Sequence, residues 1–270
     1  YGDWKIASGN TLTAGTGGAL RQVGSKLTND GTVRWDTATT LQGGNSSVLT
    51  NTALIEVRQS ADFQWNFGGR PTLTNEASGT IRAANSSTLN IGNYALTSNG
   101  GKFEADSGSA IVYSGDSNRF NDGTSFAGDH RMTNQSRYVG TIASDNLRWI
   151  SGTQYGGDGV TPGSKAIFSG QVSWEGGDLQ QNFEIKSGAT LTATGATAKR
   201  QIGSGLTNNG TFDWSTGATL QGGNSSVFTN NGRFDMMADA AVTWNFGGQA
   251  SLVNNGLLVK TAGAGTSDLS

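Results

Sequence analysis

Short stretches of alternating apolar and polar residues recur along the chain, separated by turn-forming residues. Val33 and Trp35 stand on one side of the alternation, and Phe212 and Trp214 repeat this arrangement later in the chain. The stretches are 4–6 residues long and are bounded by Gly, Asn and Ser. Alternation with a period of two is typical of β-strands, and no segment shows a convincing helical period. The pattern therefore predicts an all-β protein.

The alternation is organised in two nested repeats. Residues 9–75 align without a gap onto residues 188–254, with 36 identities in 67 positions. Within each copy the motif Leu-x-Asn, or Phe-x-Asn, returns at steps of 22 and 24 residues. Repetition at this period indicates structural units that stack on one another around a continuous core.

Each unit of 22–24 residues contains three short strands and three turns, as one coil of a parallel β-helix would. We therefore predict a right-handed parallel β-helix (β-solenoid) of roughly a dozen coils, with neighbouring coils about 4.8 Å apart. We expect residues 1–270 to form a single continuous domain. The segment 99–180 keeps the strand-and-turn pattern with a less regular step, and GGDGVTPGSK (156–165) is the best candidate for a loop that leaves the coil.

The alternation and the motif assign side chains to the inside of the coil. Asparagines at equivalent positions of stacked coils can pair amide to amide, as in cross-β stacks, and the glycines of N-x-G, such as Gly31 and Gly210, are expected to supply a positive φ at the corner. The Gly-Gly doublets, which no Lys-Ser/Thr follows, are expected to be coil corners rather than phosphate loops. The residues expected to form the asparagine ladder are Asn29, Asn51, Asn75, Asn208, Asn230 and Asn254. The residues expected to form the core aromatic stack are Trp35, Trp65, Phe67, Trp214, Trp244 and Phe246.

Composition narrows the class of protein. Charged residues make up 14% of the chain, against roughly 25% in typical domains, but 7 Trp and 11 Phe argue against disorder. The formal net charge of −2 gives no basic surface for a nucleic acid, and no apolar run is long enough to span a membrane. The absence of Cys excludes a disulfide framework and a thiolate metal site.

Few residues suggest chemistry. Polysaccharide-cleaving β-helices need clustered carboxylates with a base, and the nearest approach is Asp129 beside His130, the only histidine. We expect this segment to be a solvent-exposed loop or corner and assign no catalytic residue. No cofactor is expected, although Asp116, Asp122 and Asp158 stand in turns of a kind that can bind Ca²⁺.

A ligand surface is sought in the less regular middle. Aromatic residues there are the better candidates for exposure, because those of the regular copies share faces with Phe and Val. The candidate ligand surface consists of Trp149, Trp174, Tyr138 and Tyr155.

The runs LTNNGTFDWSTGATLQGG, FTNNGRFDM and VSWEGGDLQQNFEIKSGATLTATG resemble the β-strand repeats of large bacterial secreted surface proteins. The broad class comprises filamentous haemagglutinin-like proteins and the β-helices of autotransporter passengers. The resemblance covers most of the chain, and its motifs report coil geometry rather than a functional site. It implies a secreted or cell-surface location and a structural or adhesive role.

Two functions from different classes follow. The first is a non-enzymatic structural or adhesive rod, a segment of a large secreted surface protein or a subunit of an extracellular filament. The alternative is a carbohydrate-binding or polysaccharide-cleaving β-helix. The chain begins with Tyr1 rather than Met and shows no polar cap at either end, so we expect the polypeptide to continue or copies to associate end to end. Carbohydrate or a host or cell surface is the other expected partner.

Overall fold

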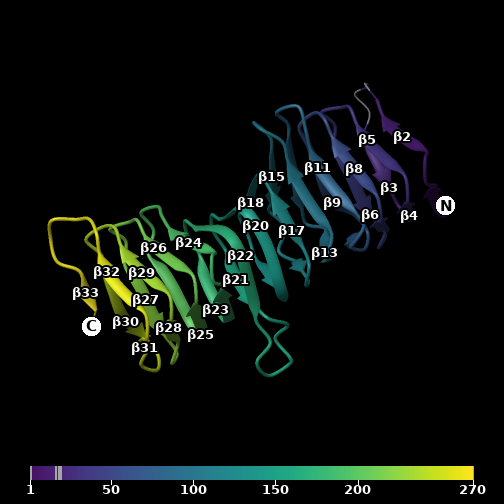
Figure 1. The fold of residues 1–270 in the computed structure, drawn as a ribbon. Helices are drawn as coiled ribbons and strands as arrows, with labels where there is room; N and C mark the ends of the chain where they lie inside the picture. Colours follow the sequence, from purple (N-terminus) through teal and green to yellow (C-terminus); the bar gives the residue numbers. More distant parts are fainter. Residues whose placement is uncertain (1, 16, 18–19, 270) are drawn as a thin grey trace. The chain divides into compact units, whose positions relative to one another are not determined.

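The computed structural model describes residues 2–15, 17 and 20–269, and all of its regular elements are β-strands. The chain divides into two compact units, unit 1 (Tyr1–Ser136) and unit 2 (Arg137–Ser270). Each unit is a β-solenoid of stacked parallel strands, and the described residues make about 12 turns in all (Figure 1). The predicted all-β solenoid is thereby confirmed, whereas a single continuous domain remains a prediction.

Unit 1 repeats three strands per coil, so that each strand from β1 to β15 pairs in parallel with the third strand after it. Three ladders result, which begin at β1, β2 and β3 and form the three faces of the coil. The strands of unit 1 are β1 (Trp4–Ile6), β2 (Thr11–Ala14), β3 (Arg21–Val23), β4 (Lys26–Asn29), β5 (Thr32–Trp35), β6 (Leu41–Gly44), β7 (Val48–Asn51), β8 (Leu54–Val57), β9 (Ala61–Phe67), β10 (Thr72–Glu76), β11 (Thr80–Ala83), β12 (Thr88–Gly92), β13 (Ala95–Asn99), β14 (Lys102–Ala105), β15 (Ala110–Tyr113), β16 (Asn118–Phe120), β17 (Ser125–Ala127) and β18 (Asp129–Met132).

Unit 2 uses the same parallel stacking, but several of its strands are long enough to serve two faces. The first part of β25 pairs with β27 and its second part with β28, because the chain bends within the strand. After β19 (Ser136–Tyr138), which crosses the boundary between the units, the strands are β20 (Gly140–Trp149), β21 (Thr153–Gly156), β22 (Ala166–Trp174), β23 (Asp178–Ile185), β24 (Thr190–Ala193), β25 (Lys199–Asn208), β26 (Thr211–Trp214), β27 (Leu220–Gly223), β28 (Val227–Asn230), β29 (Arg233–Met236), β30 (Ala241–Phe246), β31 (Ser251–Asn254), β32 (Leu257–Lys260) and β33 (Asp268–Leu269).

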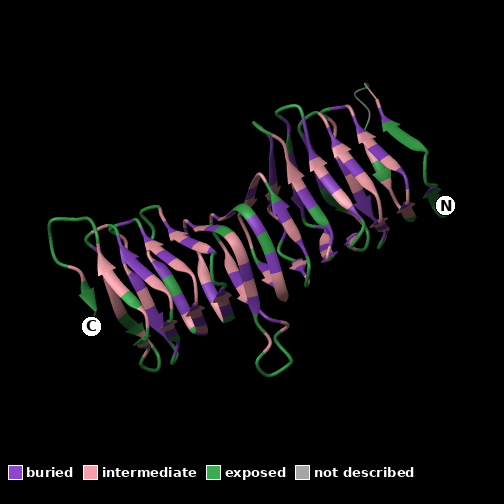
Figure 2. Ribbon diagram, viewed as in Figure 1, coloured by how far each residue is buried: buried purple, intermediate pink, exposed green. Residues whose placement is uncertain are grey.

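Burial follows the alternation of the sequence along most strands, as the banded ribbons of Figure 2 show. In β5, Val33 and Trp35 are buried while the residues before each of them are half-exposed. Buried aromatic rings then stack from coil to coil: Phe212 lies 5.0 Å from Phe234, almost parallel to it. Complete burial of a side chain of this size contributes about 1.5–3 kcal/mol, so each coil is held to the next largely by its inward residues.

The less regular middle of the sequence forms coils as well. Strands β13 to β23 continue through it, and the 157–165 segment between β21 and β22 forms a loop that leaves the strands, as predicted (Figure 1). Asp158 shapes this loop by accepting hydrogen bonds from the Thr161 hydroxyl and from the amides of Val160 and Thr161. These bonds, with that of the hydroxyl the largest, lower the pKa of the Asp158 carboxyl.

The glycines of the N-x-G turns have a different role from the one the sequence predicts. Gly31, Gly210, Gly232 and Gly256 are absent from the glycines with positive φ. A Cβ on Gly31 would instead overlap the carbonyl oxygens of Asn10 and Ala7 in the preceding coil. Glycine stands there because the backbones of two coils approach closely.

Left-handed backbone occurs at the NSS corners. Asn45 and Ser46 have φ values of 51° and 56°, and Asn224 and Ser225 repeat them at 51° and 60°. Asn tolerates this conformation better than most residues. The prediction that the doublets 43–44 and 222–223 are corners was wrong: these glycines end strands β6 and β27, and the Asn-Ser pair that follows makes the left-handed turn.

Candidate functional site

The asparagine ladder of unit 1 runs through the interior along one ladder of strands. The Nδ2 of Asn29 donates to Oδ1 of Asn51 at 2.7 Å, and the Nδ2 of Asn51 donates to Oδ1 of Asn75 at 2.7 Å. All three side chains are fully buried. The strands place them in register, since Asn29 pairs with Asn51 and Asn51 with Asn75.

Unit 2 contains the same ladder. The Nδ2 of Asn208 donates to Asn230 at 2.8 Å, and the Nδ2 of Asn230 donates to Asn254 at 2.7 Å. Asn208 and Asn230 are fully buried, while Asn254 is exposed. The amide-to-amide stacking that the sequence predicts is thus present in both units.

Each ladder amide also bonds to the backbone, so that little of its polarity is left without a partner. Asn29 donates to the carbonyl of Leu54 at 2.9 Å and accepts from the amide of Gly31 at 3.2 Å. Buried polar groups are costly when unpaired and rigidify a structure when satisfied. The ladder therefore fixes the register of neighbouring coils from inside the core.

Charged side chains form a second column on the outside of unit 1. Arg34, Glu56 and Arg82 stand in register on β5, β8 and β11, and Glu56 lies 3.7 Å from Arg34 and 3.8 Å from Arg82. Arg82 also forms a two-bond pair with Asp106, at 2.9 and 2.8 Å. Because these groups are partly exposed, the pairs contribute little individually, but opposite charges in register disfavour a slipped pairing.

The aromatic residues proposed as a ligand surface are mostly inside the molecule. Trp149, Trp174 and Tyr138 are completely buried, and the Trp149 Nε1 donates to the Tyr138 hydroxyl at 3.1 Å. Tyr155 is half-buried, with the guanidinium of Arg137 4.9 Å from its ring centre. The prediction of exposure was wrong because the coil pattern continues through the middle segment and these residues fall on its inward positions.

Two of the tryptophans assigned to the core are at the surface. Trp65 and Trp244 are 43% and 53% exposed, although Trp35 and Trp214 are buried as predicted. The register shifts by one residue at Asn66 in β9, and at the equivalent place in β30. A β-bulge of this kind re-aims the side chains around it, and alternation read from the sequence cannot reveal it.

The phenylalanines that follow these tryptophans take part in the corner. Phe67 and Phe246 are half-buried rather than buried. A Cβ on Gly44 would overlap the ring and the carbonyl oxygen of Phe67, and a Cβ on Gly223 would overlap the ring of Phe246. The second glycine of each doublet is therefore required because the phenylalanine of the next coil lies against it.

The segment that contains the single histidine is a strand and not the solvent-exposed loop that we expected. His130 on β18 is completely buried, with Nδ1 3.2 Å from the Tyr113 hydroxyl and Nε2 2.9 Å from the Ala127 carbonyl oxygen. Its ring lies 5.1 Å from that of Phe126. Asp129 pairs with Arg131 on the same strand. These contacts place the imidazole in an aromatic core.

Two of the three aspartates considered for Ca²⁺ bond to other groups of the chain. Asp116 pairs with Arg70 at 2.5 Å, and Asp158 organises its own loop. Among the described residues, no three His, Cys, Asp or Glu side chains are grouped so that they could hold a metal ion.

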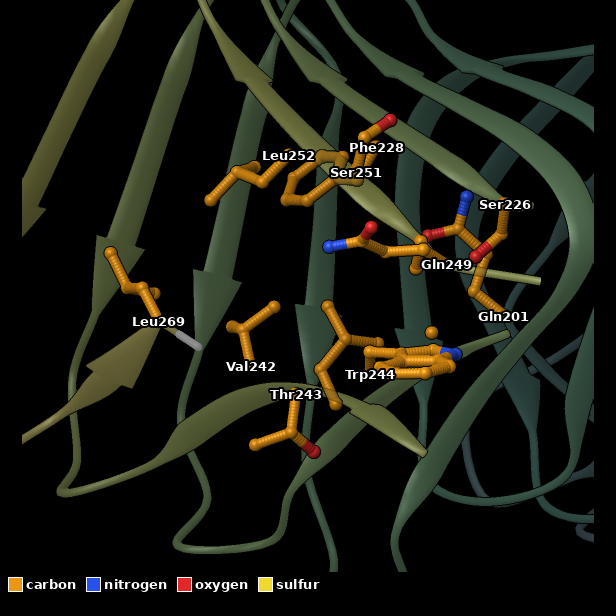
Figure 3. A pocket seen from close by; sticks show the side chains of 13 residues that line it. Gln201, Ser226, Phe228, Val242, Thr243, Trp244, Gln249, Ser251, Leu252 and Leu269 are labelled. Carbon is orange, nitrogen blue, oxygen red and sulfur yellow. The ribbon is translucent and has the colours of Figure 1, made fainter. Parts of the chain in front are cut away.

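A pocket of about 360 Å³ lies in unit 2 beside Gly222 (Figure 3). Trp244, Gln249 and Gln201 lie on one side of it, and Val242 and Leu269 on the other. None of the described residues that line it is charged.

The corresponding place in unit 1 is filled. Gly43 is the equivalent of Gly222, and a Cβ on Gly43 would overlap the hydroxyl of Tyr94, which is itself buried. In unit 1 the coil that follows the repeat supplies this aromatic ring.

Sequence reasoning missed the buried amine of Lys199. Lys199 has an inward position on β25 and no exposed surface, and its Nζ donates to the carbonyls of Glu175 and Thr197 at 2.8 and 2.6 Å. Burial lowers the pKa of this amine to about 8, against the opposing effect of the Glu175 charge. The inward position of Lys199 shows in the structure, where the residue pairs with the buried Leu220.

No protein-family model, curated protein or solved structure matches the chain. Within residues 2–15, 17 and 20–269 there is no helix of the length and apolarity needed to cross a membrane.

Proposed function

We propose that this chain is a non-enzymatic structural or adhesive β-solenoid, either a segment of a large secreted surface protein or a subunit of an extracellular filament. The observation that carries the proposal is the buried asparagine ladder, which joins successive coils in both units. Backbone ladders and this side-chain ladder run in the same direction, from coil to coil. A stack bonded in this way resists being pulled apart or entered by a protease.

The expected partners are further coils, from the continuing polypeptide or from a second copy. Apolar side chains are exposed on the outermost strands: Trp4 is 71% and Leu12 48% exposed in unit 1, and Leu257 is 51% exposed in unit 2. Unpaired strand edges with apolar side chains readily pair with another strand. The secreted or cell-surface location rests on the resemblance of the repeats to those of bacterial surface proteins.

Electron microscopy of the native protein in its source tests this proposal. An antibody against the peptide GGDGVTPGSK (156–165) can label it, because this segment forms an outlying loop and Val160 at its tip is 87% exposed. We expect labelled rods or filaments at the cell surface or in the medium. Antibody absorbed with the same peptide is the control, and label confined to compact particles inside cells would contradict the proposal.

A further inference from the structure

The loop between β21 and β22 stands apart from the coils of unit 2 (Figure 2). Residues 159–163 are all exposed, and the side chain of Val160 is the most exposed of the large apolar side chains described. Other exposed apolar side chains, such as those of Trp65 and Val227, lie on strands. Exposed loop tips with small or polar residues are preferred sites of cleavage by proteases.

The tip of this loop is not bonded to any coil. Among the described residues, 159–163 form hydrogen bonds only within the loop: the amides of Val160 and Thr161 and the Thr161 hydroxyl donate to Asp158. The amide of Ser164 donates to the Thr161 carbonyl at 3.0 Å. A protease must draw several residues into an extended conformation before it can cut. Here such local opening would break the bonds to Asp158 but none between coils.

The short turns and the strands are held differently. At the NSS corner of unit 1 the amide of Asn45 donates to the carbonyl of Phe67 in the next coil at 3.0 Å. Val227 is 38% exposed, but it lies on β28, which pairs with β25 on one side and with β31 on the other. Cleavage at either place would require neighbouring coils to separate first.

The contacts that join the two sides of the loop do not involve its tip. Strand β20, which precedes the loop, pairs in parallel with β22, which follows it, and β21 pairs with β23. In the core, the Trp149 ring lies 5.2 Å from that of Phe168. On the surface, the Arg148 guanidinium donates twice to the Glu175 carboxylate, at 2.6 and 3.2 Å. A chain that is cut at the tip would keep all of these contacts.

We propose that this loop is a processing site, cut in the folded chain by a protease that recognises a small aliphatic side chain, and that the two pieces stay assembled. The Val160–Thr161 peptide bond breaks, and water supplies the hydroxyl group of the new carboxyl on Val160 and a hydrogen of the new amine on Thr161. The structural role proposed above requires no such cut, so the processing site is an additional property of the chain.

Brief digestion of the whole native chain with pancreatic elastase, which cleaves after small aliphatic residues, tests the proposal. Mass spectrometry locates the cuts, and gel filtration without denaturant shows whether the pieces stay together. Val227 is the matched control within the chain, because it is an exposed valine in a paired strand. We expect cleavage after Val160 to be at least about tenfold faster than after Val227, since only the loop opens without separating coils. Pieces 1–160 and 161–270 should elute as one particle.

Substitutions at Asp158 test the role of the bonds that hold the tip. Asp158→Ala removes their acceptor and should be cut about tenfold faster than the native chain, whereas Asp158→Asn keeps an acceptor oxygen and should be cut at nearly the native rate. Val160→Asp should stop cleavage at this bond, and circular dichroism must show that each variant is folded.

Two results would overturn the proposal alone. One is a loop that stays intact under conditions in which the denatured chain is fully digested, and the other is a pair of pieces that elute separately. Cuts spread over the coils at the same rate as in the loop would overturn the structural role as well.

Discussion

At the scale of single residues, Asn51 shows how an amide is accommodated in a core. Its side chain accepts a hydrogen bond from Asn29, donates to Asn75 and approaches the carbonyls of Ala53 and Thr80 at 3.1 and 3.2 Å. An apolar residue would match the burial of this position, but it would leave the amides above and below with fewer partners. Unpaired buried polar groups cost more than the net gain from a bond.

We expect Asn51→Leu to lower the free energy of unfolding by about 1–3 kcal/mol, because it leaves Asn75 Oδ1 without its donor. Denaturant unfolding measures the loss. Asn231→Leu is the control, since Asn231 belongs to a similar amide ladder, with Asn209 and Asn255, on the exposed surface. Its effect should stay within about 0.5 kcal/mol. Equal losses in the two variants would show that burial of the ladder does not matter.

Lys199 gives a prediction for pH. Burial lowers its pKa to about 8 from an ordinary value of 10.5, so between these two values the unfolded chain binds more protons than the folded one. The contribution of Lys199 to stability therefore rises as the pH rises from 8 to 10.5. We expect Lys199→Met to remove about 1–3 kcal/mol of this rise, measured by denaturant unfolding at several pH values.

The exposed Lys26→Met provides the comparison for Lys199. Burial also raises the pKa of the Tyr94 phenol, which lowers stability once the unfolded chain loses that proton above about pH 10. The comparison is therefore made at the same pH for every variant. If the free energy of unfolding depended on pH in the same way in the native chain and in Lys199→Met, the rise in stability could not be assigned to Lys199.

At the scale of the coil, close backbone contact and side-chain stacking together determine the sequence. Gly31 is needed because the preceding coil lies against it, and Gly44 because Phe67 of the following coil does. The bulge in β9 adds one residue, so that Trp65 is displaced outward while Phe67 reaches Gly44. Residues such as Gly31 and Gly44 therefore recur in the repeat because each is in close contact with an adjacent coil.

We expect Gly31→Ala to destabilise unit 1 by about 1–3 kcal/mol, because the added methyl would overlap the carbonyl oxygens of Asn10 and Ala7. Gly24→Ala tests the same substitution where there is room, since the nearest atom to a Cβ there is Asn45 Nδ2 at 3.7 Å. Thermal melting should leave the Gly24→Ala variant unchanged or slightly stabilised. A Gly31→Ala protein as stable as the native one would refute the close-contact explanation.

Period and parity were sufficient to predict the solenoid, the ladder asparagines and the burial of Trp35 and Trp214. They failed at Trp65 and Trp244, because a one-residue bulge leaves no mark on an alternating pattern. The prediction that Trp149 and Trp174 are exposed failed for a different reason. The coils of the less regular middle still enclose a core, and both side chains point into it. Lys199 was missed as well, because a charged side chain is expected to face the solvent, whereas this one is buried in the core.

At the scale of the molecule, the account rests on cooperation between stacked coils. Each coil contacts its neighbours through parallel strand ladders and stacked aromatic rings, and some coils are also joined by an asparagine ladder. In such arrays stability is close to a sum of coil and interface contributions. The chain should therefore yield to force by whole coils.

Pulling single molecules by their termini tests the structural role most directly. One coil of roughly 24 residues at about 3.4 Å per residue should lengthen the chain by about 80 Å, and we expect a sawtooth of resisted steps at whole multiples of this increment. Asn51→Leu should lower the force of the steps that involve its coil, while Asn231→Leu should not. Extension at near-zero force without steps would contradict a structural role for the stacked coils.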